Sequence, residues 1–285
     1  MRNFLLSHPN LNPFNNYFRM FTSPIRLMPD VIIAGFHKTS TTSLHYYLIQ
    51  HPNIGAPTRK EIGYFSTFFW RGESWYRSHF PTTFSKFFKS LKKQNFIVLD
   101  SDPICSFHPL SPQRVKERLP KTKIIFVLRN PIDRAWSDYN QDIRKGHFPD
   151  ISFQEKIKKD ELSFQKRMEQ FKNEKMLDGK KHTIYRPYLS ISKYIIHINN
   201  WLEYFPKNQI LFLTTDEIDL DLNKSLNKIF DFLEIPSKNI SSLERQNVGK
   251  YPKMDPETRQ QLIEFFKPYN KKLETLLGKS FHWDN

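Results

Sequence analysis

Cysteine is almost absent from this sequence, and so are long apolar stretches. The single cysteine, Cys105, can form no intrachain disulfide, so the fold does not depend on an oxidising compartment. No group of Cys and His residues has the spacing of a metal site. Residues 1–21 are interrupted by Pro and Asn and lack both the roughly 18 apolar residues of a membrane span and the apolar core of a signal peptide. We therefore expect a cytoplasmic protein with no transmembrane segment and no metal.

Acidic residues are also scarce relative to basic ones. The 285 residues include 44 Lys and Arg against 29 Asp and Glu, which gives a formal net charge of +15. Such a surplus is typical of proteins that bind nucleic acids, phosphorylated cofactors, sulfated or carboxylated glycans, or acidic membranes. Lysines that are simply solvated would give the same balance, so charge alone leaves these partners open.

The chain does contain enough apolar material for one packed core. Hydrophobic residues make up 38% and Phe occurs 26 times, which is typical of a globular domain rather than a disordered chain. Four short apolar runs indicate buried parallel strands, at residues 30–35, 95–100, 123–128 and 209–213. Helices are expected at 41–50, 131–145, 152–178, 188–205, 222–233 and 255–277. The alternation predicts an arm over 1–29 and one α/β domain over 30–285, with a central parallel sheet flanked by helices.

The loop after the first predicted strand has the composition of an anion site. It has the sequence GFHKTSTTSL, from Gly35 to Leu44, and connects that strand to a helix. Backbone N–H groups and the positive end of a helix dipole converge at such a junction. Lys38 adds a cation, and hydroxyl groups follow it at Thr39, Ser40, Thr41, Thr42 and Ser43. The order differs from the Walker A pattern, in which Lys directly precedes the hydroxyl residue that binds Mg²⁺.

A second junction of this kind follows the third predicted strand. Arg129 ends the strand, and Asn130-Pro131 has the chemistry of a helix N-terminus. Ser137 lies about two helical turns into the helix. A guanidinium at this position can contact a phosphate with its planar fork, so we expect a second phosphate-binding element here.

Three segments together resemble the sulfotransferases that use 3′-phosphoadenosine-5′-phosphosulfate (PAPS). GFHKTSTTSL resembles their 5′-phosphosulfate loop, usually GxxKxGTTxL, although Ser40 stands where that pattern has Gly. Residues 129–139 resemble their 3′-phosphate motif, RxPxxRxxSxY. Lys60-Glu61-Ile-Gly-Tyr-Phe65 resembles the KExxxF segment of heparan sulfate sulfotransferases. The likeness continues through residues 192–210 and reaches Gly249-Lys250, which resembles the basic loop that closes on the cofactor.

The resemblance implies a P-loop-like, three-layer fold and a set of site residues. Lys38, residues 39–43, Arg129, Ser137, Gly249 and Lys250 would bind PAPS. Glu61 would be the general base, with Lys38 and Lys60 as its catalytic partners. The acceptor would be a hydroxyl or amine compound, most closely an anionic carbohydrate. Residues 100–103 lack the Lys that the family often has in the corresponding turn.

Two other functions remain open from the sequence. A P-loop kinase or NTPase would use Asp100, at the end of FIVLD, to hold Mg²⁺. That alternative leaves the position of Lys38 and the pair Arg129–Ser137 without explanation. A non-catalytic nucleic-acid binder would use the net positive charge, yet no recognisable nucleic-acid module is present, so we expect no nucleic-acid partner.

Overall fold

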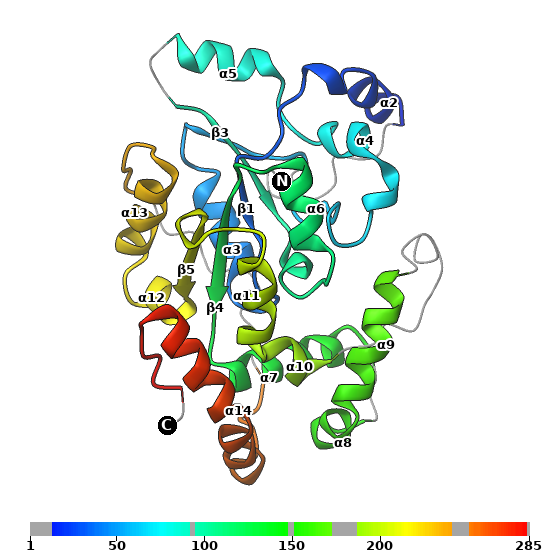
Figure 1. Ribbon diagram of the computed structural model, residues 1–285, viewed down its shortest axis with the longest axis vertical. Coiled ribbons are helices and arrows are strands. Elements are labelled where there is room, and N and C mark those ends of the chain that lie inside the picture. Colours follow the sequence, from blue (N-terminus) through cyan, green and yellow to red (C-terminus); the bar gives the residue numbers. More distant parts are fainter. Residues whose placement is uncertain (1–12, 92–94, 148–150, 173–186, 241–250, 284–285) are drawn as a thin grey trace.

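A parallel sheet of five strands forms the centre of the molecule (Figure 1). The computed structural model describes residues 13–91, 95–147, 151–172, 187–240 and 251–283. The strand order is β2-β3-β1-β4-β5, and every pairing is parallel. The strands are β1 (Val31–Ile33), β2 (Ile54–Gly55), β3 (Ile97–Ser101), β4 (Lys123–Leu128) and β5 (Ile210–Thr214). All four predicted strands are present, with ends shifted by a few residues, and the short edge strand β2 was not predicted.

Helices surround the sheet on both faces. The α-helices of the described residues are α2 (Pro13–Phe21), α3 (Thr41–Leu48), α4 (Glu73–Arg77), α5 (Thr83–Ser90), α6 (Ser111–Arg118), α7 (Pro131–Arg144), α8 (Phe153–Lys158), α9 (Asp160–Lys172), α10 (Tyr188–Ser192), α11 (Tyr194–Leu202), α12 (Thr215–Leu220), α13 (Leu222–Leu233) and α14 (Pro256–Leu277). Short 3₁₀ turns occur at Ser23–Ile25, Phe69–Arg71, Pro103–Ser106 and Lys207–Gln209. None of these α-helices is both long and apolar enough to cross a membrane.

Successive strand residues point to opposite faces of the sheet, which produces two cores. Val31 and Ile33 of β1 pack in one buried cluster with Leu44 of α3 and with α12 and α13. Ile32 packs in the other cluster, with Trp201 of α11 and with α6. A third buried cluster joins α7, α8, α10 and α14. The three-layer α/β fold with a central parallel sheet, predicted from the sequence, is therefore confirmed.

Two of the predicted helices are interrupted. The stretch 188–205 forms two helices because Lys193 leaves the helical conformation, with ψ at 61°. The stretch 152–178 also divides, at Lys159, and its residues 173–178 lie outside the described residues. Buried Asp160 accepts hydrogen bonds from the backbone N–H groups of Leu189 and Ser190. This tertiary contact fixes α9 against α10, and the local pattern of charges does not reveal it.

Candidate functional site

A cavity of about 350 Å³ lies at the carboxyl ends of β1 and β4. After β1 the chain builds β2 and β3 on one side, and β4 and β5 lie on the other. Strand order thus reverses between β1 and β4, which is where open α/β sheets bind ligands. Nine predicted site residues line the cavity: Lys38, Ser40, Thr41, Thr42, Ser43, Lys60, Glu61, Arg129 and Ser137. Residues that are distant in the sequence thus meet in one place.

The loop between β1 and α3 forms one wall. Lys38 and Ser40 both adopt the left-handed region, with φ of 70° and 63°, which costs about 1–2 kcal/mol for a residue with a Cβ. The side chain of Ser40, the N-cap residue of α3, makes no capping hydrogen bond. The first residues of that helix line the cavity, so their N–H groups, which lack this capping acceptor, and the positive end of the helix dipole lie beside it. This wall is suited to an anion.

Thr39 differs from the other predicted hydroxyl residues. Its side chain is fully buried, and its Oγ1 donates a hydrogen bond of 2.7 Å to the carbonyl of Phe36. Thr39 does not line the cavity. The hydroxyl group therefore holds the turn of the loop.

Arg129 and Ser137 line the cavity from the end of β4 and from helix α7. The Asn130 side chain accepts hydrogen bonds from the N–H groups of Ile132 and Asp133, which confirms the predicted helix start at Pro131. Arg129 Nη1 lies 3.4 Å from the Lys38 carbonyl. The guanidinium therefore stands beside the loop that follows β1.

Three lining residues, namely His37, Gln141 and Lys145, were not predicted. Gln141 and Lys145 follow Ser137 by four and eight residues, and that spacing places residues on the same face of a helix. The spacing could therefore have identified them once Ser137 was assigned.

Burial lowers the pKa of Lys38, and the neighbouring cations Arg144, Arg129 and Lys145 lower it further, whereas Asp138 opposes them. The cavity thus concentrates positive charge.

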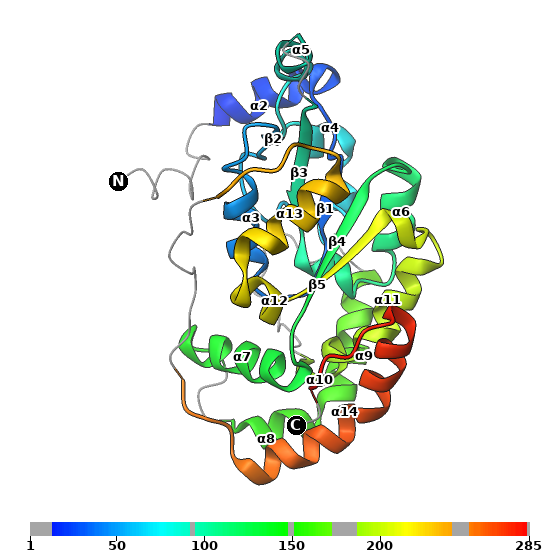
Figure 2. The ribbon, with the colours of Figure 1, turned by 90° about the vertical axis from the view of Figure 1, so that its left-hand side faces the viewer.

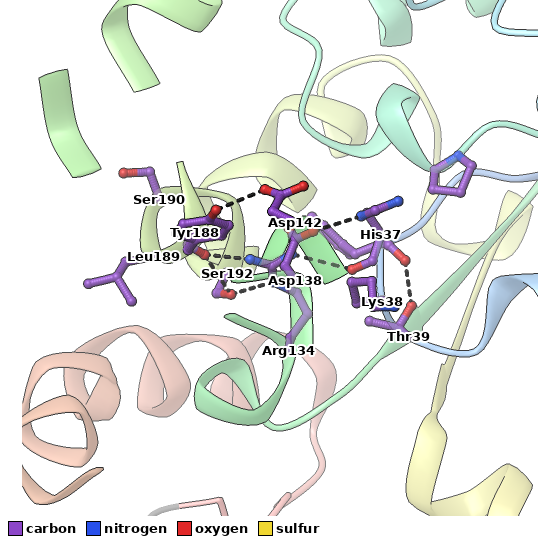
Figure 3. A network of polar contacts seen from close by, with 12 residues as sticks. His37, Lys38, Thr39, Arg134, Asp138, Asp142, Tyr188, Leu189, Ser190 and Ser192 are labelled. Atoms are coloured by element: carbon purple, nitrogen blue, oxygen red, sulfur yellow. Dashed lines mark hydrogen bonds and ion pairs between the residues drawn. The ribbon is translucent and has the colours of Figure 1, made fainter. Parts of the chain in front are cut away.

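A buried polar network fixes the loop against α7 (Figure 3). Arg134 is fully buried, and its Nη1 lies 3.0 Å from Asp138 Oδ2 and 3.3 Å from the His37 carbonyl. Its Nε and Nη2 donate to Ser192 and to the Tyr188 carbonyl. Asp138 also lies 3.2 Å from the His37 ring. Arg134, the second arginine of the predicted phosphate motif, therefore positions the wall and does not line the cavity.

Glu61 and Lys60 approach the cavity from the segment after β2. The Glu61 N–H donates 3.1 Å to the Ser101 carbonyl at the end of β3, and Glu61 has a φ of 59°. The Lys60 ammonium forms a salt bridge with the Glu61 carboxylate. Burial alone would raise the pKa of Glu61, but Lys60 together with His37 and Lys145 outweighs it, so the pKa lies below its ordinary value. Glu61 is therefore ionised at neutral pH and can accept a proton.

Asp100, the residue that a kinase would need, does not line the cavity. It is buried, and its carboxylate accepts hydrogen bonds from the Tyr76 hydroxyl at 2.6 Å and the Ser101 N–H at 2.7 Å. Burial raises its pKa to about 7. Asp100 thus occupies a core position beneath the site. The predicted residues Gly249 and Lys250 lie outside the described residues.

Comparison with known proteins gives a consistent result. The sulfotransferase domain model matches residues 28–267. Membrane-associated sulfotransferase kil1 of Dictyostelium discoideum is 25% identical over 90% of this chain and 67% of its own. Heparan sulfate glucosamine 3-O-sulfotransferase 3B1 of Mus musculus is 28% identical over 96% of this chain and 69% of its own. The chain thus spans about two thirds of the length of these relatives.

A solved structure agrees with this fold. The sulfotransferase from Alicyclobacillus acidocaldarius aligns with a TM-score of 0.72 and 24% identity, covering 91% of this chain and all of its own. That likeness supports the three-layer architecture described above. The family match extends from the residues before β1 into α14 and includes the whole lined cavity. This chain therefore belongs to the sulfotransferase domain family and is an enzyme of that class.

Proposed function

We propose that this enzyme transfers a sulfuryl group from PAPS to a hydroxyl or amine of an anionic glycan. The observation that carries the proposal is the set of residues that line one cavity. Lys38 and the start of α3 line it together with Arg129 and Ser137, and a carboxylate, Glu61, lies at the same cavity. Two phosphate-binding elements and a base are the parts that transfer from PAPS requires.

Each wall would bind a different anionic group. The loop amides and Lys38 would hold the 5′-phosphosulfate, because the helix dipole and the cation both favour negative charge there. Arg129 and Ser137 would hold the 3′-phosphate through the guanidinium fork and the hydroxyl. The assignment of Gly249 and Lys250 to the same nucleotide remains a prediction from the sequence.

The reaction would be an in-line displacement at sulfur. Glu61 accepts the proton of the acceptor O–H or N–H, and the acceptor atom forms a bond to sulfur. The bond from sulfur to the 5′-phosphate oxygen breaks, and the electron pair leaves with 3′,5′-ADP. Lys38 stabilises the charge that develops on this oxygen, as positioned donors do in phosphoryl transfer. Lys60 holds the Glu61 carboxylate ionised and in place. We propose that no metal takes part, because these cations already neutralise the transferred group.

Cations at the cavity support an anionic carbohydrate as the acceptor. Lys60 and Lys145 line the cavity, and Lys145 is exposed, so carboxylate or sulfate groups would find cations next to the base. The 3-O-sulfotransferase relative acts, by its name, on glucosamine of heparan sulfate, which supports this acceptor class. We propose that nucleic acid is not a partner and, from the single Cys105, that the protein is cytoplasmic.

Binding of two nucleotides tests the proposal. We expect wild type to bind 3′,5′-ADP far more tightly than 5′-AMP, which lacks the 3′-phosphate. A charged hydrogen bond contributes roughly 1.5–3 kcal/mol, so Arg129→Ala should weaken binding of 3′,5′-ADP by about ten- to a hundredfold. The same variant should barely change the weak binding of 5′-AMP. Isothermal titration calorimetry measures all four affinities.

Two further variants sharpen this comparison. Ser137→Ala should weaken 3′,5′-ADP binding less than Arg129→Ala, because the hydroxyl is neutral. Arg118→Ala removes a half-exposed guanidinium on α6 and should leave both affinities unchanged. Equal binding of both nucleotides by wild type, or an equal loss of both in Arg129→Ala, would contradict the assignment of the 3′-phosphate site.

A further inference from the structure

Helix α5 presents its apolar side to water. Phe84, Phe87, Phe88 and Leu91 follow the spacing i, i+3, i+4 and i+7, which places them on one side of a helix. Their exposed fractions are 60%, 56%, 63% and 65%. None of the described side chains of α5 is buried. A surface helix ordinarily turns such a stripe toward the core, so α5 has the opposite orientation.

The polar side of α5 faces the protein instead. Lys86 lies on the side of the helix opposite the aromatic stripe, and its Nζ is 3.8 Å from Asp30 Oδ1, next to the start of β1. A helix of eight residues is not stable by itself in water. Phe87 and Phe88 contact each other without burying their rings in the molecule. The stripe therefore lacks the covering that would normally stabilise such a helix.

Helix α2 repeats this arrangement. Tyr17, Phe18 and Phe21 are 73%, 63% and 84% exposed. Arg19 turns inward, with Nε 2.6 Å from the Ser78 carbonyl and Nη2 3.2 Å from the Phe80 carbonyl. Two short helices thus direct a cation at the body and aromatic rings at the solvent. We call the seven exposed side chains the outer aromatic face: Tyr17, Phe18, Phe21, Phe84, Phe87, Phe88 and Leu91.

Both helices lie at the same end of the molecule, in both views (Figures 1 and 2). The backbone bridge between Arg26 and Thr82 joins the segment after α2 to the residue before α5. Arg26 Nη1 also donates 2.8 Å to the Phe80 carbonyl. Helix α7, which lines the cavity, lies at the opposite end. The outer aromatic face is therefore separate from the site described above.

Charge indicates what covers this face. Residues 1–29 and 74–99, which contain both helices, include no Asp or Glu. Asp30 and Glu73, which border these ranges, are paired with Lys86 and Arg77. Their basic residues are Arg2, Arg19, Arg26, Arg77, Lys86, Lys89, Lys92 and Lys93. Exposed Phe and Tyr beside Lys and Arg, without acidic residues, are the composition of helices that lie in the headgroup region of anionic membranes. A protein partner of ordinary composition would require some complementary acidic or polar contacts from this segment.

We propose that the outer aromatic face docks the protein on the surface of an anionic membrane. Phe84, Phe87 and Phe88 would enter the boundary between headgroups and acyl chains. Lys89 would extend along the helix to the phosphate and carboxylate groups of the lipids, as long basic side chains do. The cavity end of the protein would then be directed away from the lipid. This attachment is peripheral and involves no membrane-spanning segment.

Vesicle co-sedimentation tests the proposal. We expect wild type to sediment with vesicles of phosphatidylcholine and phosphatidylserine, and much less with phosphatidylcholine alone or at high salt, because lipid charge is screened. The variant Phe84→Ser/Phe87→Ser/Phe88→Ser should lose at least about tenfold in affinity, since three aromatic side chains no longer leave water. Lys89→Glu should weaken binding to the anionic vesicles specifically.

Leu220→Ser is the matched control. Leu220 is 89% exposed at the end of α12, outside the outer aromatic face, so its replacement should leave sedimentation unchanged. Unchanged thermal unfolding and 3′,5′-ADP binding would show that each variant is folded. Wild type that stays in the supernatant, or a triple serine variant that sediments as wild type does, overturns the proposal. So does a lipid-free dimer, detected by sedimentation velocity, that the triple variant converts to monomer, since a second copy then covers the face.

Discussion

Ser40 carries local strain at the centre of the anion loop. Its φ of 63° is one that glycine adopts at little cost, and glycine is the residue that the family pattern has at this position. A side chain at such a position can widen the loop, because it prevents a close approach of the backbone. The structure instead retains the tight turn, and α3 begins directly after Ser40. The loop therefore keeps its shape, and the side chain at this position is accommodated by backbone strain at Ser40.

Ser40→Gly should therefore stabilise the protein. Relief of the left-handed conformation gains about 1–2 kcal/mol, and the greater freedom of glycine in the unfolded chain offsets about half of it. We expect the melting temperature to rise by about 1–3 °C, measured by calorimetry. Ser163→Gly, inside helix α9, is the matched control and should lower it, because glycine weakens a helix. A lower melting temperature for Ser40→Gly would mean that the Ser40 side chain stabilises the loop.

Glu61 is the residue whose chemistry can be isolated most directly. Glu61→Gln should fold and bind 3′,5′-ADP as wild type does, and lose turnover by about 10²–10⁴-fold, the usual contribution of a general base. The carboxylate form is present above the pKa of Glu61, which lies below its ordinary value. The acidic limb of the rate profile should therefore fall below pH ~4.5. Near-wild-type turnover of the variant, or a limb near neutral pH, would remove Glu61 from this role.

Sequence motifs identify the residues that line the cavity where their positions depend on the local backbone. Lys38, Arg129 and Ser137 follow strands whose apolar runs are evident, and parallel strands bring their carboxyl ends to one edge. Thr39 shows where this reasoning ends. Its hydroxyl belongs to the same run as four lining residues, and only the turn of the loop directs it to the Phe36 carbonyl. Whether each side chain of the run points into the cavity or into the protein depends on the tertiary structure, so the sequence motif does not predict it.

At the scale of elements, α7 and the β1–α3 loop act as one unit. Arg134 connects the helix to the His37 carbonyl, and through Ser192 and Tyr188 to α10. The motif gives the position of this arginine without these partners, because Tyr188 and Ser192 lie more than fifty residues further along and His37 lies 97 residues earlier. Helix α5 is a second case in which the local sequence does not reveal the tertiary contacts. Its stripe of Phe residues is typical of a core helix, but the folded chain turns it outward.

Arg134→Met should destabilise the protein strongly. Removal of the guanidinium leaves the Asp138 carboxylate, which is 6% exposed, without its buried partner, and breaking a buried ion pair costs about 3–5 kcal/mol. The free energy of unfolding in urea measures this loss. Arg144→Met, at the exposed end of the same helix, should change it by less than about 0.5 kcal/mol. Similar stability of the two variants would contradict the structural role given to Arg134.

At the scale of the whole molecule, the topology determines where the positive charge acts. The surplus of 15 charges is spread over the chain, yet the reversal of strand order between β1 and β4 brings Lys38, Arg129 and Lys145 to one cavity. The repulsion among them contributes to the lowered pKa of Lys38. A bound polyanion would relieve this repulsion. Net charge alone left four classes of partner open. The choice among them depends on the parallel sheet, because the sheet brings these cations together at one cavity.

Ligand binding should therefore stabilise the whole molecule, and it should do so without metal. At a concentration of 3′,5′-ADP one hundred times its dissociation constant, mass action adds about 2.7 kcal/mol to the free energy of unfolding. This corresponds to a rise in melting temperature of about 5–10 °C for a protein of this size. At the same concentration 5′-AMP should give a much smaller rise, because the wall of Arg129 and Ser137 stays without a phosphate. Both shifts should persist in EDTA, since the cations that we assign to the phosphates are side chains.

A kinase would give the opposite result. If Asp100 held Mg²⁺, the shift in melting temperature would be lost on chelation and restored by Mg²⁺, and it would be larger for ATP than for 3′,5′-ADP. The buried contacts of Asp100 with Tyr76 and Ser101 argue for the first outcome, and differential scanning fluorimetry with these three nucleotides distinguishes the two.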